Sequence, residues 1–125
     1  MEQEKILIVD DEVDLREALS SALTAAGFVT LTAVDGEEGL TKALAHKPNL
    51  ILLDIDMPKM NGHKVLSELR RDVWGKTVPV ILLTNSDDPA NMVQGFGLKS
   101  SDYLIKSNIS LEDLTKKVRL SLAGF

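Results

Sequence analysis

Acidic residues follow directly after apolar runs at two places in this sequence. The stretch VDDE (9–12) closes one run and LLDID (52–56) closes another, while Thr84 and Lys106 close two more. Burying a carboxylate is costly unless it is paired or hydrogen-bonded, so an acid at the end of an apolar strand indicates a functional site. What these residues do depends on whether the four segments meet.

The elements that would position them alternate along the whole chain. The predicted strands are 5–9, 28–34, 49–53, 78–83 and 102–105. Three of them, 5–9, 49–53 and 78–83, are apolar at nearly every position, which is typical of parallel strands covered on both faces. The strand 28–34 alternates more and is expected at an edge.

Helical spacing fills the intervals between the strands. The stripes are Leu15, Leu19, Ala22, Leu23 and Ala26; Leu40, Ala43 and Leu44; Val65, Leu66, Leu69 and Val73, ending near Gly75; a weaker one near Met92, Val93 and Phe96; and Leu111, Leu114, Val118 and Leu122. The predicted N-terminal caps are Asp35 with Glu38, Asn61, Asp88 before Pro89, and Ser110 with Asp113. Five βα units predict one α/β domain over residues 1–125, with an open parallel sheet and helices on both faces.

The carboxyl ends of parallel strands meet at one edge of a sheet, and ligands bind there. Asp10, Asp11, Glu12, Asp54, Thr84 and Lys106 are therefore expected at a common edge. Two unit charges about 4 Å apart repel by about 4 kcal/mol at an effective dielectric of 20, so the acids need a cation. Carboxylates without a nearby cysteine or histidine favour a hard ion, and Mg²⁺ binds one or two carboxylates together with waters and phosphate oxygens.

The same edge provides groups for a phosphate. Lys106 supplies a positive charge and Thr84 a hydroxyl donor for the remaining phosphate oxygens. Asp54 is central among these groups and is the best placed carboxylate to attack phosphorus and form an aspartyl-phosphate. The alternative for Asp10 and Asp11 alone is that they cap the following helix.

Composition limits the other classes of function. The chain has no cysteine, which excludes thiol chemistry and fits a cytoplasmic compartment. Its formal charge of −5 opposes nucleic-acid backbones, and no secretory signal or run of about 20 apolar residues is present. The sequence therefore predicts a cytoplasmic protein that binds neither nucleic acid nor membrane directly.

Four segments together resemble the receiver domains of response regulators, the phosphorylated proteins of two-component signal transduction. The matching segments are VDDE (9–12), LLDIDMPKMNG (52–62), ILLTN (81–85) and DYLIK (102–106). The resemblance covers the whole chain in the family's order. It implies a flavodoxin-like, doubly wound sheet of five parallel strands in the order 2-1-3-4-5, with five helices.

The resemblance also implies roles for single residues. Asp54 would accept a phosphoryl group from a phosphohistidine on a sensor histidine kinase or phosphotransfer protein. Mg²⁺ would be held at Asp54 by Asp11 directly, by Asp10 through water and by the backbone carbonyl of Asp56. Thr84 and Lys106 would contact the phosphoryl oxygens. Tyr103 would swing inward when Thr84 moves, and Pro58 and Gly62 would shape the loop after Asp54, the glycine by permitting unusual backbone angles.

Two positions depart from the family pattern. Ser107 replaces the usual proline after the strand-five lysine, which predicts a looser loop at Lys106. Asn85 replaces a small residue after the threonine and is expected to crowd the phosphoryl site. His46 and His63 are predicted to be solvated surface residues. Trp74 and Met57 are predicted to be packing residues.

We expect a switch that binds an unidentified downstream protein through the helix near Met92, strand 102–105 and the last helix, with a homodimer formed on phosphorylation as an option. It would not be an enzyme beyond its own phosphotransfer and dephosphorylation. One alternative is a degenerate receiver that binds partners without phosphorylation. Another is a small phosphatase, because Asp54-Ile55-Asp56 resembles the DxD of haloacid-dehalogenase-type enzymes. A flavin or nucleotide module is disfavoured, because no glycine-rich loop follows the first strand.

Overall fold

The computed structural model describes residues 3–85 and 102–124. The strands are β1 (Lys5–Val9), β2 (Val29–Ala33), β3 (Leu50–Asp54), β4 (Val80–Thr84) and β5 (Asp102–Ile105). The helices are α1 (Val13–Ala25), α2 (Gly36–His46), α3 (Gly62–Arg70) and α5 (Leu111–Leu122), with short 3-10 helices at Trp74–Lys76 and Lys106–Asn108. The helix predicted near Met92 and its cap at Asp88 lie outside the described residues.

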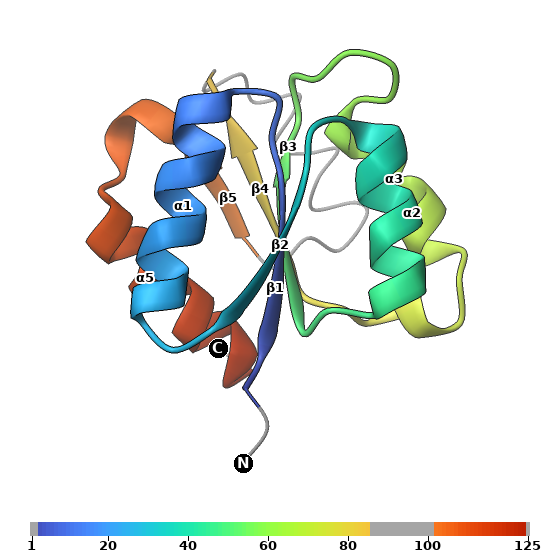
Figure 1. Cartoon of the computed structure of the whole chain (residues 1–125). Helices are drawn as coiled ribbons and strands as arrows, with labels where there is room; N and C mark the ends of the chain where they lie inside the picture. The colour runs from blue at the N-terminus through green and yellow to red at the C-terminus, as the bar shows by residue number, and fades with distance from the viewer. Residues whose placement is uncertain (1–2, 86–101, 125) are drawn as a thin grey trace.

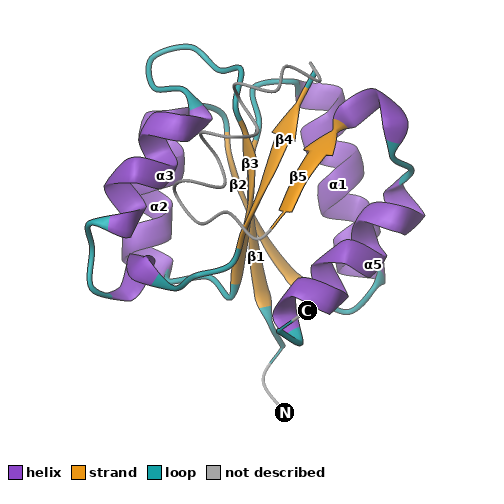
Figure 2. Cartoon of the chain, turned by 180° about the vertical axis from the view of Figure 1, so that it is seen from behind, coloured by secondary structure: helices purple, strands orange, loops and turns teal. Residues whose placement is uncertain are grey.

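The five strands form one parallel sheet in the order β2-β1-β3-β4-β5. Both the flavodoxin-like order and the edge position of β2 are thereby confirmed. Figure 2 shows the sheet from the β5 side, with its strands running in one direction between two layers of helices. All the carboxyl ends of the strands consequently lie at the same edge.

Alternation along the central strands builds two cores. Leu7 and Val9 of β1 face a cluster shared with α2 and α3, whereas Ile6 and Ile8 face a cluster shared with α1 and α5. Figure 1 shows the same division, with α1 and α5 on one side of the sheet and α2 and α3 on the other. Because β1, β3 and β4 are covered on both faces, they are apolar at almost every position. The cores hold the strand ends in a fixed register.

Side-chain caps begin three of the helices as predicted. Asp35 accepts a hydrogen bond from the Glu38 backbone N–H at 2.8 Å, Asn61 from that of Lys64 at 2.9 Å, and Ser110 from the backbone N–H of Asp113 at 3.1 Å. Each cap satisfies an N–H group that has no partner within the first helical turn. α1 differs, because the residue before it, Glu12, makes no side-chain cap.

The prediction that the third helix extends to Val73 was wrong. α3 ends at Arg70, and Val73 is 87% exposed. Backbone hydrogen bonds from Arg71 to Glu68 and from Asp72 to Leu69 tighten the chain into a turn at this point. The Arg70 guanidinium then donates to the carbonyls of Gly75 and Val78 at 2.7 and 2.8 Å, which draws the chain back toward β4.

Candidate functional site

The predicted site residues come together at the carboxyl edge of the sheet. Asp54 ends β3 and lies opposite Leu83 of β4, whereas Thr84 ends β4 and lies opposite Ile105 of β5. Asp10 and Lys106 follow the last residues of β1 and β5. Asp10, Asp54 and Thr84 are fully buried. Buried polar residues at these strand ends require partners, and the neighbouring strand ends supply them.

Lys106 is the positive centre of this group. Its Nζ atom lies 3.0 Å from Asp10 Oδ2, 3.2 Å from Asp54 Oδ2 and 3.3 Å from Glu12 Oε1. The lysine side chain is only 8% exposed. Ser107 is exposed and lies in the 3-10 helix that begins at Lys106. The looser loop expected from Ser107 stays a prediction, but the lysine contacts both buried acids.

Three carboxylates form a group that fits a hard divalent cation. One oxygen each from Asp10, Asp11 and Asp54 lies within 4.8 Å of the others, the only such group found among residues 3–85 and 102–124. Asp11 is exposed, so the group opens to solvent on one side. All three donors are carboxylate oxygens, which suits Mg²⁺ better than zinc or copper. Among the described residues, Lys106 is the one ammonium paired with these acids, so their net charge stays negative and favours a bound cation.

The acids and the lysine change one another's ionisation. Burial and the charge of Asp10 raise the pKa of Asp54 to about 7, against the opposing charge of Lys106 and the Asp56 backbone N–H. Burial opposes the positive charge of Lys106, but hydrogen bonding to Asp10 and the charges of Asp54 and Asp10 outweigh it and raise the pKa of Lys106. Without a metal, Asp54 is therefore partly protonated near neutral pH and lies beside a charged Lys106.

The structure gives Asp10 a role other than capping α1. Its Oδ1 atom accepts a hydrogen bond from the Glu12 backbone N–H at 2.9 Å, and its backbone carbonyl accepts one from Arg16 at 2.8 Å. Its other carboxylate oxygen faces Lys106. The alternative that Asp10 merely caps the helix is not supported, because α1 begins after Glu12 without a side-chain cap.

Asp56 bridges the ends of β3 and β4 through its side chain. Its Oδ2 atom accepts hydrogen bonds from Thr84 Oγ1 at 3.3 Å and from the Asn85 backbone N–H at 3.4 Å. Its own backbone N–H donates to Asp54 Oδ1 at 3.1 Å. In the receiver interpretation, the sequence predicted a role for the backbone carbonyl of Asp56 and did not predict these side-chain contacts. Asn85 itself is exposed, and the crowding expected from it stays a prediction.

The loop after Asp54 packs tightly on its neighbours. Gly62 is required for close approach, since a Cβ atom there would lie 2.5 Å from the Asp54 carbonyl oxygen. Its φ lies outside the left-handed region, so the predicted reason for this glycine was wrong. Lys59 has a φ of 67° and forms an ion pair with Asp35 at 3.4 Å. A Cβ atom at Gly36 would lie 2.0 Å from the Met60 carbonyl oxygen, so the start of α2 also supports this loop.

Four further residues carried sequence predictions. Tyr103 is 8% exposed and belongs to the core between the sheet and α2 and α3. Met57 is buried in the same core and Trp74 packs against it, as predicted. His46 is exposed as predicted, but His63 is only 5% exposed, so its surface assignment was wrong. His63 precedes Leu66 by three residues on α3, a spacing that places both on the buried face.

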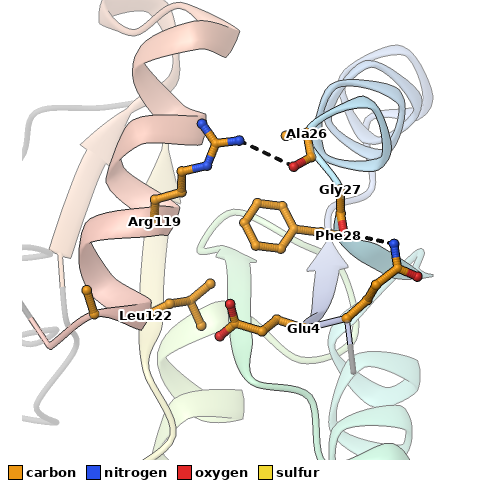
Figure 3. A pocket seen from close by; sticks show the side chains of 8 residues that line it. Glu4, Ala26, Gly27, Phe28, Arg119 and Leu122 are labelled. Atoms are coloured by element: carbon orange, nitrogen blue, oxygen red, sulfur yellow. Dashed lines mark hydrogen bonds between the residues drawn. The ribbon is translucent and has the colours of Figure 1, made fainter. Parts of the chain in front are cut away.

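A groove of about 550 Å³ lies away from the acidic site, between the ends of α1 and α5. Figure 3 shows Phe28, Arg119 and Leu122 around it, with Arg119 donating to the Ala26 carbonyl at 3.3 Å. The groove gathers no cluster of catalytic or metal-binding groups. The chemistry therefore belongs to the strand-end acids. No helix in the described part of the chain is long and apolar enough to cross a membrane.

The fold and the site define a doubly wound α/β domain with an acidic, lysine-containing pocket at the carboxyl edge of its sheet. The family model for the response regulator receiver domain matches residues 6–119. The chain therefore belongs to the response regulator receiver domain family.

Two similar transcriptional regulators are longer than this chain. The chain is 39% identical over 117 residues to the "Probable transcriptional regulator ycf27" of Cyanophora paradoxa, covering 94% of this chain and 47% of that protein. It is 40% identical over 102 residues to the "Alkaline phosphatase synthesis transcriptional regulatory protein PhoP" of Bacillus subtilis (strain 168), covering 82% and 42%. The chain thus spans about half the length of these relatives.

Solved structures agree with the fold. The chemotaxis protein CheY4 of Vibrio cholerae superposes with a TM-score of 0.89 at 30% identity, covering 95% of this chain and 98% of that one. A CheY-like response regulator receiver domain protein of Methanospirillum hungatei JF-1 has a TM-score of 0.92 at 26% identity, covering 98% and 96%.

Proposed function

We propose that this domain accepts a phosphoryl group on Asp54 from a phosphohistidine of a sensor histidine kinase or a phosphotransfer protein. The observation that carries the proposal is the burial of Asp54 among two further acids and Lys106, whose Nζ lies 3.2 Å away. An Asp54 carboxylate oxygen forms the new bond to phosphorus while the bond from phosphorus to the histidine nitrogen breaks. The leaving imidazole keeps the electron pair of that bond and takes up a proton.

Asp10, Asp11, Asp54 and the backbone carbonyl of Asp56 would hold Mg²⁺. When bound, the ion neutralises the acids and the incoming phosphoryl oxygens. Lys106 supplies a fixed positive charge beside Asp54, and the Thr84 hydroxyl supplies a donor for a phosphoryl oxygen. Because Lys106 already contacts Asp10 and Asp54, its side chain needs little rearrangement to reach a phosphoryl oxygen on Asp54.

Phosphorylation would act on partners through a shift between two conformations. About two negative charges are added at the strand ends, and Thr84 and Tyr103 are the residues proposed to respond. The output face would include β5 and α5, together with the segment near Met92, which lies outside the described residues. A downstream protein or a second copy of the chain would bind there. Similarity to transcriptional regulators over half their length fits an output in gene regulation, without direct nucleic-acid binding by this domain.

In this function the domain is a cytoplasmic switch and not an enzyme with an external substrate. In the phosphatase alternative, the second acid of Asp54-Ile55-Asp56 would be the general acid and base, yet the Asp56 carboxylate accepts hydrogen bonds from Thr84 and Asn85. In the degenerate-receiver alternative, Asp54 would not react. The buried lysine and acids at Asp54 favour the reactive form.

The test is incubation with acetyl phosphate and Mg²⁺, followed by intact mass spectrometry. The wild-type protein should gain one phosphoryl group, whereas Asp54→Asn and a wild-type sample treated with EDTA should gain none. Unchanged mass in the folded wild type would favour the degenerate receiver. Steady turnover of a generic phosphate ester by the wild type, lost in Asp56→Asn, would favour the phosphatase.

A further inference from the structure

The Asp56 side chain connects the predicted phosphoryl acceptor to the residue predicted to respond to it. Asp56 Oδ2 accepts the Thr84 hydroxyl at 3.3 Å and the Asn85 backbone N–H at 3.4 Å. Its backbone N–H holds Asp54 Oδ1 at 3.1 Å. Thr84 is buried, whereas Asp56 is exposed, so the contact runs from the sheet outward to the loop after β3.

A threonine hydroxyl carries a single proton and can donate one hydrogen bond at a time. In the structure the Thr84 hydroxyl donates to Asp56 Oδ2 across 3.3 Å, because a carboxylate can only accept. A phosphoryl oxygen on Asp54 would need the same proton. The hydroxyl must therefore leave Asp56 before it can donate to the phosphoryl group.

The contact of Asn85 with Asp56 means that backbone atoms, and not only the Thr84 side chain, must move when Thr84 leaves Asp56. The same Oδ2 atom accepts the backbone N–H that directly follows Thr84. Movement of Thr84 toward Asp54 would also draw this N–H from its acceptor. The two bonds are long, but both end on the same carboxylate oxygen, so together they favour the resting arrangement.

We propose that the Asp56 carboxylate holds Thr84 in the unphosphorylated position and thereby opposes activation of the switch. The inference rests on the proposed function, because it needs a phosphoryl group at Asp54. Asp56 is a positioning residue in this account, acting through Thr84. Its backbone carbonyl, proposed to face the metal, is unaffected by changes to its side chain.

The experiment measures the affinity of beryllofluoride, an unreactive phosphoryl mimic, at saturating Mg²⁺ by ¹⁹F NMR titration. The proteins are the wild type, Asp56→Ala, Thr84→Ala and the double variant. Asp56→Ala should bind beryllofluoride about three- to ten-fold more tightly than the wild type, because the hydroxyl no longer has a competing acceptor. In the Thr84→Ala background, the same change should have an effect of less than about two-fold.

Charge removal offers a rival explanation, because deleting a carboxylate also lowers repulsion of the mimic. Asp56→Asn separates the two, since the amide loses the charge but keeps an oxygen that can accept from Thr84. It should bind the mimic more weakly than Asp56→Ala does. Amide NMR shifts of Thr84 and Asn85 in unliganded Asp56→Ala should move toward those of the wild-type beryllofluoride complex.

Each outcome has a distinct meaning. An equal gain from Asp56→Ala with and without the threonine hydroxyl would overturn the inference in favour of simple repulsion. Unchanged or weaker binding in Asp56→Ala would overturn it as well. Failure of the folded wild type to bind beryllofluoride with Mg²⁺ would instead overturn the proposed function.

Discussion

Replacing Asp54 with asparagine should stabilise the metal-free protein, although it removes the proposed reacting group. The pKa of Asp54 rises from its ordinary value of 3.8 to about 7 because of burial and the charge of Asp10. The folded state thus binds a proton that the unfolded state has released between these two pH values. Ionised Asp54 therefore costs the folded protein free energy at pH 8, and this cost disappears as the pH falls toward 4.

The size of the effect follows from the same pKa difference. Each pH unit corresponds to about 1.4 kcal/mol, so the interval from 3.8 to about 7 gives an upper limit of about 4 kcal/mol. The ion pair with Lys106 ties the two titrations together, and the pocket opens to solvent at Asp11. We therefore expect Asp54→Asn to raise the free energy of unfolding by about 1–3 kcal/mol at pH 8.

Urea denaturation in EDTA at several pH values between 4 and 8 measures this difference. Subtracting the two unfolding free energies at each pH removes the titration of the acids that do not interact with Asp54, which the proteins share. Glu17→Gln, at an exposed residue on α1, is the control and should change stability by less than about 0.5 kcal/mol at either pH. The reasoning is refuted if Asp54→Asn is no more stable than the wild type at pH 8, or if its advantage is the same at pH 4.

Three further predictions concern the surroundings of Asp54. Without metal at pH 8, Lys106→Met should lower the free energy of unfolding by about 2–4 kcal/mol in urea denaturation, because it leaves buried acids without their cation. Millimolar Mg²⁺ should restore part of this loss. Equal losses with and without Mg²⁺ would contradict the explanation. Gly36→Ala should weaken Mg²⁺ binding in calorimetry, because the new Cβ displaces the loop at Met60. Gly75→Ala is the control: its new Cβ would lie 2.1 Å from the Leu69 carbonyl oxygen, away from the acids, so it should destabilise the fold but leave the Mg²⁺ affinity unchanged. Equal Mg²⁺ affinities in the two variants would contradict the role given to Gly36. Arg70→Met should lower the free energy of unfolding by about 1–3 kcal/mol in urea denaturation, because the carbonyls of Gly75 and Val78 lose their donor. It should leave the Mg²⁺ affinity at the wild-type value. A weaker affinity would show that the loop at Gly75 influences the acidic site.

The convergence of Asp10, Asp54, Thr84 and Lys106 was predictable from the sequence. Each follows an apolar run, and parallel strands bring such positions to one edge whatever the details of the helices. The strand order came from the family resemblance, since periodicity alone does not order strands within a sheet. Glu12 was placed at the same edge, but its contact with Lys106 depends on side-chain rotamers that a sequence does not specify.

The errors have local physical causes. Val73 continues the helical spacing of Leu69. The Arg70 guanidinium, however, donates to the carbonyls of Gly75 and Val78, and the chain turns before Val73 can join the helix. His63 was assigned to the surface because no ligand partner lies at helical spacing from it in the sequence. It follows Gly62, which packs directly on the Asp54 carbonyl, so the start of α3 is pressed against the end of β3. Such a close approach depends on how the loop folds back on the strand, which the spacing of apolar residues does not describe.

The most direct test of the acidic pocket is isothermal titration of Mg²⁺ into the wild-type protein and Asp11→Asn. Asp11 is exposed, so its replacement should leave the fold intact, which circular dichroism can verify. The account predicts saturable binding by the wild type at millimolar or lower Mg²⁺ and an affinity at least about ten-fold weaker in Asp11→Asn. Absence of binding by the folded wild type, or equal affinities in the two proteins, would contradict it.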